Sequence, residues 1–277
     1  MRVLIVPNTD NAQALTAAAE LAGWLRSAGH DPAMLTADAE AAGMPALAAS
    51  GDRPALVVTL GGDGTILRAV HALDGEDVPV LGVNLGRLGF LTGADAEEMT
   101  EAVASALAGE VNVDRLAMLD VELETTEGSL SRRALNEVFI GRGSGSRAVE
   151  LAVAVNGEEL LRFVCDGVIV ATASGSTAYA LSVGGPLIAP SVCGTLLVPV
   201  GAHTLAQRPF VLGPEDAVQI TCPNPQRADA CAVVDGVQAC SDPFLRARVS
   251  RGTHEVRLLR PHGRHFYEVV RRKFLGG

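Results

Sequence analysis

Residues 54–70 of the sequence read PALVVTLGGDGTILRAV, and this stretch decides the fold of the first part of the chain. The apolar run 55–60 is typical of a buried strand, and helical spacing begins at Ile66. The glycines between them permit a tight turn that a ligand can approach closely. Because a helix start presents unpaired N–H groups, strand, turn and helix together predict a phosphate-binding site. Its expected residues are Gly61, Gly62, Gly64 and Thr65.

Asp63 lies in the middle of this turn, where a carboxylate would repel a bound anion unless it holds a cation or takes up a proton. This position favours a general base or a magnesium ligand. An ordinary structural explanation stays open, because Asp tolerates left-handed backbone and caps helices.

The first hundred residues alternate short apolar strands with helical patterns. We predict strands at 3–6, 55–60 and 78–83, and helices at 12–28 and 66–73. This alternation predicts an α/β domain with a Rossmann-like parallel sheet, in which binding sites form beyond the carboxyl ends of the strands.

From about Val111 the pattern changes to β-like segments with turn signals, including predicted strands at 134–140 and 163–171. Asn156-Gly157 and Asp235-Gly236 are strong hairpin signals. We therefore expect a mostly antiparallel, all-β second domain and a last helix at 265–274 that packs back on the first domain. The predicted boundaries are residues 1–110, joined by 260–277, and residues 111–259.

Composition limits the classes of function. With 277 residues, 48% of them hydrophobic, the chain is long enough for two domains. The longest apolar runs fall far short of the roughly 20 residues of a membrane-spanning helix, and the first residues lack a signal-peptide pattern, so we expect a cytoplasmic protein. A net charge of −10 argues against nucleic-acid and membrane partners. Five scattered cysteines predict reduced thiols and no metal site built by the protein alone.

Three later segments carry further signals. The glycine-interrupted loop 84–91 follows a predicted strand and contains Phe90. Asn136 and Glu137 interrupt an apolar strand, and since neighbouring strand residues point to opposite faces, at least one faces a core or cleft and needs a polar partner. The segment 165–186 opens a strand into a loop rich in hydroxyls and glycines, chemistry that suits ribose and amide groups.

The turn Gly61–Gly62–Asp63–Gly64–Thr65 resembles the signature that NAD kinases share with diacylglycerol kinases, sphingosine kinases and phosphofructokinases. The order of residues 165–186 and the Asn136-Glu137 pair resemble NAD kinases in particular. Weaker similarities at 115–119, 199–205 and Asp235-Gly236 extend the resemblance over most of the chain.

This resemblance implies transfer of a terminal phosphate from ATP or polyphosphate to the 2′-hydroxyl of the adenosine ribose of NAD, with a divalent cation, most simply Mg²⁺, and Asp63 as base. It implies a dimer or tetramer. It also places Phe90 beside the dinucleotide, although a core role for this ring stays open. The other residues that it assigns to NAD are Asn136, Glu137, Asp166, Ser174, Thr177, Ala178 and Tyr179.

The sequence departs from the family pattern at Ala173, at Gly201-Ala202 before His203, and at Val237. These departures concern substrate preference more than the reaction. His203 is a candidate site residue or a structural one, and the arginines of 141–147 are candidates for phosphate contact. Two alternatives stay open, namely a dinucleotide sensor without catalysis and a lipid or sugar kinase of the same superfamily. The net charge of −10 argues against the lipid kinase.

Overall fold

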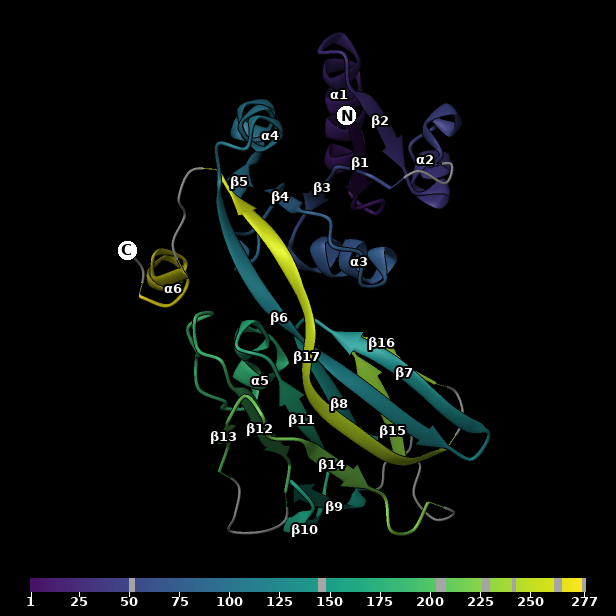
Figure 1. Ribbon diagram of the computed structural model, residues 1–277, viewed down its shortest axis with the longest axis vertical. Helices are drawn as coiled ribbons and strands as arrows, with labels where there is room; N and C mark the ends of the chain where they lie inside the picture. The colour runs from purple at the N-terminus through teal and green to yellow at the C-terminus, as the bar shows by residue number, and fades with distance from the viewer. Residues whose placement is uncertain are drawn as a thin grey trace. The chain divides into compact units, whose positions relative to one another are not determined.

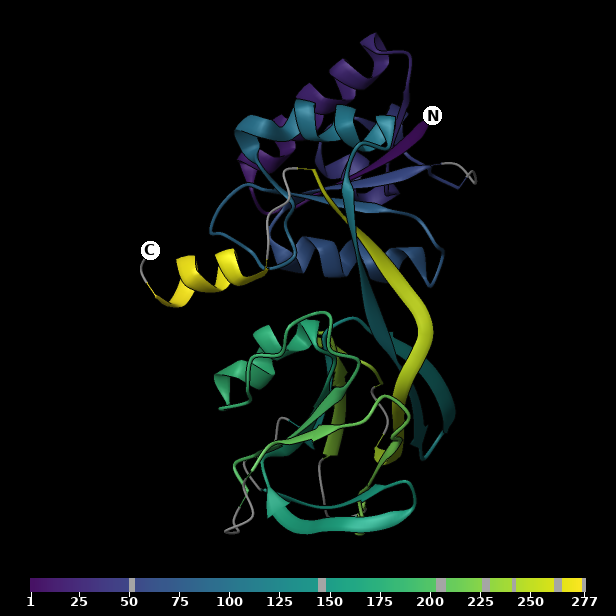
Figure 2. The same ribbon diagram turned by 60° about the vertical axis from the view of Figure 1, so that its left-hand side comes forward.

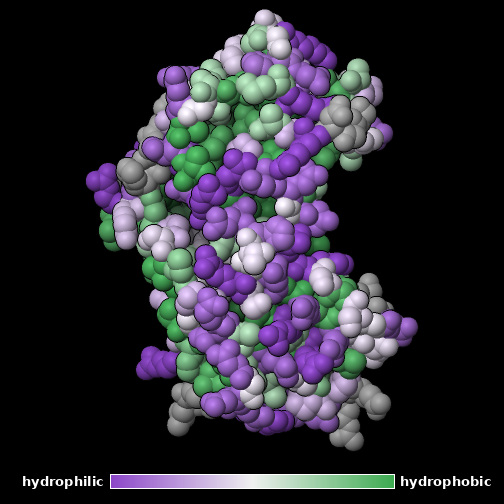
Figure 3. All heavy atoms as spheres, in the orientation of Figure 1, coloured by the Kyte–Doolittle hydropathy of each residue, from purple (hydrophilic) through white to green (hydrophobic). Residues whose placement is uncertain are grey.

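A computed structural model describes residues 1–49, 53–143, 148–202, 208–225, 230–240, 243–261 and 266–275. The chain forms two compact units, Met1–Leu116 with Glu255–Gly277, and Ala117–His254. Figure 3 shows hydrophilic side chains interleaved with smaller hydrophobic areas on the face that it presents. Among the described residues, no helix is long and apolar enough to cross a membrane.

The first unit is built on a parallel sheet with strand order β17-β4-β3-β1-β2 (Figure 1). Its elements are β1 (Arg2–Pro7), α1 (Ala12–Ser27), β2 (Asp31–Met34), α2 (Thr36–Ala41), β3 (Leu56–Gly61), α3 (Asp63–Leu73), β4 (Val80–Asn84), β5 (Ala94–Asp95), α4 (Met99–Ala108), α6 (Phe266–Phe274) and the short 3₁₀ helices Pro45–Leu47 and Ala96–Glu98. The strands β6 (Asn112–Thr125) and β17 (Phe244–Arg260) have residues in both units.

Helices cover both faces of this sheet. In both ribbon views α1 and α4 lie on one face and α3 on the other (Figures 1 and 2). Leu21 and Leu25 of α1 pack with the strand residues Ile5 and Val58 in a core without solvent exposure. β1 lies between β2 and β3, so the chain order reverses beside β1. Ligands of such sheets bind at the carboxyl ends of the strands at this reversal, where the turn after β3 lies.

The second unit is a β-sandwich. One antiparallel sheet has the order β13-β12-β11-β8-β15-β16, and the other contains β10-β9-β14-β17 together with β6 and β7. Residues from both sheets share one buried core, including Leu119, Ile140, Val168 and Phe244. The remaining elements are β7 (Gly128–Ala134), β8 (Glu137–Arg142), β9 (Val149–Val155), β10 (Glu158–Cys165), β11 (Gly167–Ala171), the 3₁₀ helix Ser174–Thr177, α5 (Tyr179–Ser182), β12 (Thr195–Val200), β13 (Phe210–Leu212), β14 (Val218–Thr221), β15 (Ala230–Val234) and β16 (Val237–Gln238).

The predicted fold class is confirmed, and the last helix belongs to the first unit, where Phe266 of α6 packs on Phe90. The hairpins at Asn156-Gly157 and Asp235-Gly236 also form, with positive φ at all four residues. The boundaries between the two units fall in the middle of β6 and of β17, so no linker separates them in sequence.

Two predicted strands are wrong, because each is divided. The segment 163–171 forms β10 and β11, and the segment 134–140 forms the end of β7 and most of β8. In both cases the chain leaves one sheet of the sandwich and enters the other. The divisions fall at Asp166 and at Leu135-Asn136, so polar residues within apolar runs mark the crossings between sheets.

The sandwich core makes a stability prediction. Leu119 of β6 is fully buried, whereas Leu160 of β10 is 42% exposed. We expect Leu119→Ala to lower the free energy of unfolding by about 2–5 kcal/mol, because it removes buried methyl groups and leaves a cavity. Urea unfolding followed by circular dichroism measures this change. The matched control, Leu160→Ala, should cost less than about 1 kcal/mol; equal losses in the two variants would contradict the assigned core.

Candidate active site

The turn after β3 leaves open space above its glycines. Gly62 precedes α3, and a Cβ atom placed on Gly62 or Gly64 would meet no atom within 4 Å. A Cβ on Gly61 would instead collide with the hydroxyl of Thr65, so Gly61 permits the close packing of the turn. The peptide N–H of Thr65 donates to the carbonyl of Gly62 at 3.0 Å. An open helix start of this kind has free N–H groups for a phosphate.

Asp63 connects this turn to the loop that contains Phe90. Its carboxylate oxygens accept the peptide N–H groups of Phe90 at 2.8 Å and Leu91 at 2.9 Å. Gly89 lies so close to this carboxylate that a side chain there would collide with Asp63 Oδ1. The carboxylate therefore fixes the loop, and its side chain has a structural role in addition to any chemical one.

Phe90 is half-buried under α6. Its ring centroid lies 6.1 Å from that of Phe266 and 6.2 Å from that of Phe274, and Lys273 Nζ lies 4.8 Å from the ring centre. An aromatic cluster with a cation over one ring is a favourable arrangement. The ring predicted to lie beside the dinucleotide therefore packs on the C-terminal helix in this structure.

Asn136 and Glu137 lie at a crossing between the two sheets, and both are more than 90% buried. The carboxylate of Asp235 accepts three consecutive peptide N–H groups, those of Leu135 at 2.7 Å, Asn136 at 2.8 Å and Glu137 at 3.0 Å. Asn136 Oδ1 and Glu137 Oε2 have no hydrogen-bond partner within the protein. Since buried polar atoms are nearly always paired, these two oxygens indicate a site for a polar ligand.

The loop after β11 packs against this segment. Thr172 Oγ1 donates to the carbonyl of Leu135 at 2.7 Å, and Ser174 Oγ donates to the same carbonyl at 3.0 Å. A Cβ on Gly175 would collide with the carbonyl of Asn136. Thr177 Oγ1 donates to the carbonyl of Ser174 at 2.8 Å. The predicted hydroxyls of Ser174 and Thr177 thus have protein partners that hold the loop in place.

The end of this loop reaches Glu137. The peptide N–H of Tyr179 donates a hydrogen bond to the Glu137 carboxylate. Ala178, the residue before Tyr179, is partly exposed. The Tyr179 ring is 42% exposed and its centroid lies 5.7 Å from that of Phe139. The structure therefore brings Asn136, Glu137 and the Ser174–Tyr179 block together.

Asp166 lies elsewhere. It precedes β11, whose far residue Ala171 pairs with Glu137. At a rise of about 3.3 Å per residue, Asp166 is roughly 16 Å along the strand from that pair. Its carboxylate forms an ion pair with Arg142 at 3.0 Å and packs tightly against Gly201. Only an extended ligand could contact both ends of β11. His203 and Arg147 lie outside the described residues.

Sequence reasoning missed two residues. Asp235 was noted as a hairpin residue and as part of a weak family similarity, but its carboxylate holds the segment 135–137. Arg260, at the end of β17, donates to the carbonyl groups of Phe90, Leu91 and Thr92. In the sequence, both Asp235 and Arg260 are charged residues that directly follow apolar residues, and we found no other signal for these contacts.

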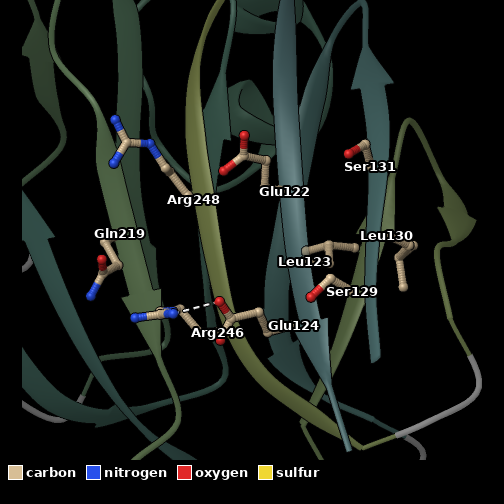
Figure 4. Close-up of a pocket in the computed structure, with 9 residues that line it drawn as sticks. All are labelled: Glu122, Leu123, Glu124, Ser129, Leu130, Ser131, Gln219, Arg246 and Arg248. Carbon is tan, nitrogen blue, oxygen red and sulfur yellow. Dashed lines mark hydrogen bonds and ion pairs between the residues drawn. The ribbon is translucent and has the colours of Figure 1, made fainter. Parts of the chain in front are cut away.

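A separate groove of about 420 Å³ lies on the sandwich between β6, β7, β14 and β17. Figure 4 shows the side chains that line it. Acidic side chains on β6 lie beside basic ones on β17, and Glu124 forms an ion pair with Arg246. The groove shares no residue with the predicted site. Across the described part of the chain, no three His, Cys, Asp or Glu side chains are grouped to hold a metal ion.

The first unit has an open glycine turn with an aspartate where ligands of parallel sheets bind, and the second has a buried polar segment. These features are typical of an enzyme that acts on phosphate-containing small molecules. Residues 3–111 match the ATP-NAD kinase N-terminal domain, and residues 135–260 match the ATP-NAD kinase C-terminal domain. The chain belongs to the NAD kinase family.

Individual relatives support this family assignment. The NAD kinase of Symbiobacterium thermophilum is 37% identical over 98% of both chains, and that of Corynebacterium diphtheriae is 36% identical over 94% of this chain and 86% of its own. The structure of yeast NADH kinase complexed with NADH has a TM-score of 0.89 at 25% identity, and covers 100% of this chain and 87% of that one. An NAD kinase from Archaeoglobus fulgidus in complex with ATP shares the fold, with a TM-score of 0.76 at 24% identity over 100% and 98% of the two chains.

Glu137 makes a pH prediction. Burial, and then the negative charge of Asp235, raise its pKa to about 7 from a usual value of 4.5, while the hydrogen bond from Tyr179 lowers it. Between these pH values the folded protein binds more protons than the unfolded chain, so stability decreases as pH rises through this window. Relative to Glu137→Gln, the wild type should lose about 3 kcal/mol of unfolding free energy between about pH 4 and pH 8. Urea unfolding at several pH values tests this, and parallel curves would contradict it.

Asp235 makes a second prediction. Asp235→Asn replaces one acceptor oxygen by an NH₂ group that must face a buried peptide N–H. We expect a loss of about 2–3 kcal/mol in unfolding free energy, because hydrogen bonds to charged groups are strong and an unpaired buried donor is costly. The matched control is Asp120→Asn on the same unit, whose carboxylate is about half exposed beside Arg133. Equal stability of the two variants would show that Asp235 does not hold the segment.

Proposed function

We propose that this enzyme transfers the terminal phosphate of ATP, or of polyphosphate, to the 2′-hydroxyl of the adenosine ribose of NAD and so forms NADP. The observation that carries the proposal is the buried Asn136-Glu137 pair, whose Oδ1 and Oε2 atoms lack protein partners. A dinucleotide offers ribose hydroxyl and amide N–H donors for such acceptors. A lipid or sugar kinase with the same glycine turn has no comparable need for this pair.

The donor phosphates would bind at the start of α3. Gly61, Gly62, Gly64 and Thr65 offer open space and backbone N–H groups there. The backbone N–H groups of this turn can bind the negatively charged phosphates, although the protein as a whole is acidic. ATP is the favoured donor, because the family that the chain matches is described as ATP-NAD kinase.

A magnesium ion fits this arrangement. Mg²⁺ usually binds to one or two carboxylates, substrate phosphates and water rather than to a complete protein cage. Asp63 is the acidic residue of the turn, and each of its oxygens accepts one N–H group and keeps a further lone pair. When bound, the ion would neutralise charge on the transferring phosphate.

The acceptor NAD would bind to Asn136, Glu137 and the Ser174–Tyr179 block, with Tyr179 and Ala178 at the exposed edge. Asp166 would contact the opposite end of an extended dinucleotide, and Phe90, which is only partly buried, would lie beside it. These roles stay predictions for individual residues.

The proposed reaction is an in-line displacement. The 2′-oxygen of the ribose forms a bond to the terminal phosphorus, the bond from that phosphorus to the bridging oxygen breaks, and ADP leaves. The 2′-hydroxyl proton passes to a carboxylate oxygen of Asp63. Positioning and neutralisation of charge supply most of the rate.

Two further expectations remain predictions. We expect a cytoplasmic protein and a dimer or tetramer, as the resemblance implies. Light scattering on the purified protein decides the oligomeric state.

Asp63 makes the functional prediction. Asp63→Asn should lower kcat for NADP formation by roughly 10²–10⁴-fold, the usual contribution of a general base. A coupled assay with Mg²⁺, NAD and either ATP or polyphosphate measures this rate. The matched control, Asp74→Asn at the exposed end of the same helix, should leave kcat unchanged, since Asn also tolerates the left-handed backbone there.

Three results would contradict the proposal. Near-normal turnover of Asp63→Asn would remove the base role. NAD binding without NADP formation from either donor would favour a dinucleotide sensor. Phosphorylation of diacylglycerol, sphingosine or fructose 6-phosphate instead of NAD would favour another kinase of the superfamily.

A further inference from the structure

Arg260 binds the carbonyl groups of the segment 90–92, and Asp63 binds the N–H groups of two of its residues. Arg260 is 93% buried, and its guanidinium donates to the carbonyl oxygens of Phe90 at 3.0 Å, Leu91 at 3.1 Å and Thr92 at 2.6 Å. Asp63 accepts the N–H groups of Phe90 and Leu91. The Asp63 carboxylate therefore accepts hydrogen bonds from N–H groups of the segment, and the Arg260 guanidinium donates hydrogen bonds to its carbonyl groups.

The two groups act on one shared peptide unit. The carbonyl of Phe90 and the N–H of Leu91 belong to the same planar amide. When a guanidinium donates to this carbonyl, it polarises the amide and strengthens the N–H as a donor, because linked hydrogen bonds reinforce one another in a poorly solvated interior. Arg260 thus strengthens the hydrogen bond from Leu91 to Asp63 Oδ1.

Asp114 fixes the orientation of the guanidinium. Arg260 Nε donates to Asp114 Oδ2 at 2.9 Å, and the Asp114 side chain is 44% exposed. With this bond, all three nitrogens of the planar fork have acceptors. A lysine ammonium carries the same charge but has only three donors and no fork, so it cannot reproduce four directed contacts.

We propose that Arg260, oriented by Asp114, is a positioning residue for the catalytic carboxylate, and that it acts through the peptide groups of residues 90–92 to fix the place of Asp63. This inference rests on the proposed role of Asp63 in phosphoryl transfer. Arg260 touches neither substrate, and it affects the rate only by controlling where the carboxylate points.

Arg260→Lys tests the proposal in the NADP assay. We expect kcat to fall about 10- to 100-fold, because a displacement of about 1 Å at a catalytic group has an effect of this size, while KM for ATP stays within about threefold. The control is Arg257→Lys on the same strand, whose arginine pairs with the exposed Asp77. This control should keep the wild-type kcat. An unchanged kcat in Arg260→Lys overturns the proposal.

A double variant separates positioning from general damage. If Arg260 acts through Asp63, then adding Arg260→Lys to Asp63→Asn should lower kcat by less than about threefold more, because the two changes remove one function. A full additional loss in the double variant overturns the proposal. Asp114→Asn gives the same test with the arginine intact, and should show a smaller loss of kcat that also vanishes in the Asp63→Asn background.

Amide hydrogen exchange tests the positioning role of Arg260 without an activity assay. In Arg260→Lys, the N–H groups of Phe90 and Leu91 should exchange at least about tenfold faster, since their hydrogen bonds to Asp63 are weakened. Unchanged exchange at these two amides overturns the proposal, even if the NADP assay shows no activity and the proposed function fails. Faster exchange with normal kcat would also overturn it, because the contact would then be structural only.

Discussion

Carboxylates that accept backbone N–H groups hold both candidate binding segments of this protein. Each segment leaves regular secondary structure, so its peptide groups lose the partners that a strand would supply, and buried peptide groups must find others. Asp63 supplies them for residues 90–91, and Asp235 supplies them for residues 135–137. Both anions are short and rigid and sit at turns, so they fix the segments at low cost in side-chain entropy. The geometry of each segment depends on its own carboxylate.

Glycines lie where each of these segments packs closely. Gly89 lies against Asp63, and Gly175 lies against the carbonyl of Asn136, and in both places a Cβ atom would collide. The close packing uses the backbone of each segment for structure and leaves particular side-chain atoms unpaired. Asn136 and Glu137 keep one oxygen each without a protein partner, which is an unusual state for buried groups. These two unpaired oxygens belong to consecutive residues.

The sequence predicts features with local causes. The turn 61–65 is readable because strand, glycines and helix follow one another directly, and the hairpin at Asp235-Gly236 is readable from two residues. Partners far apart in sequence are not readable: Asp235 lies 100 residues from Leu135, and Arg260 lies 170 residues from Phe90. The division of the segment 163–171 is hidden as well, because both halves are apolar strands and only their neighbours in space differ. The polar residue at its centre was the signal, and it was read as a ligand contact alone.

In the proposed reaction, the two halves of the site contribute differently to substrate choice. A glycine turn binds phosphate through backbone N–H groups, which any phosphate satisfies, so it discriminates little among donors or among related kinases. A buried acceptor oxygen behaves differently, because a ligand that leaves it unpaired loses about 1–3 kcal/mol per atom. Asn136 and Glu137 can therefore reject ligands that lack matching donors, in the way that sites built to hydrogen-bond a hydroxyl reject analogues without one. Selection of the acceptor then depends on the sandwich, and it depends on Asp235 because that residue fixes where the two side chains begin.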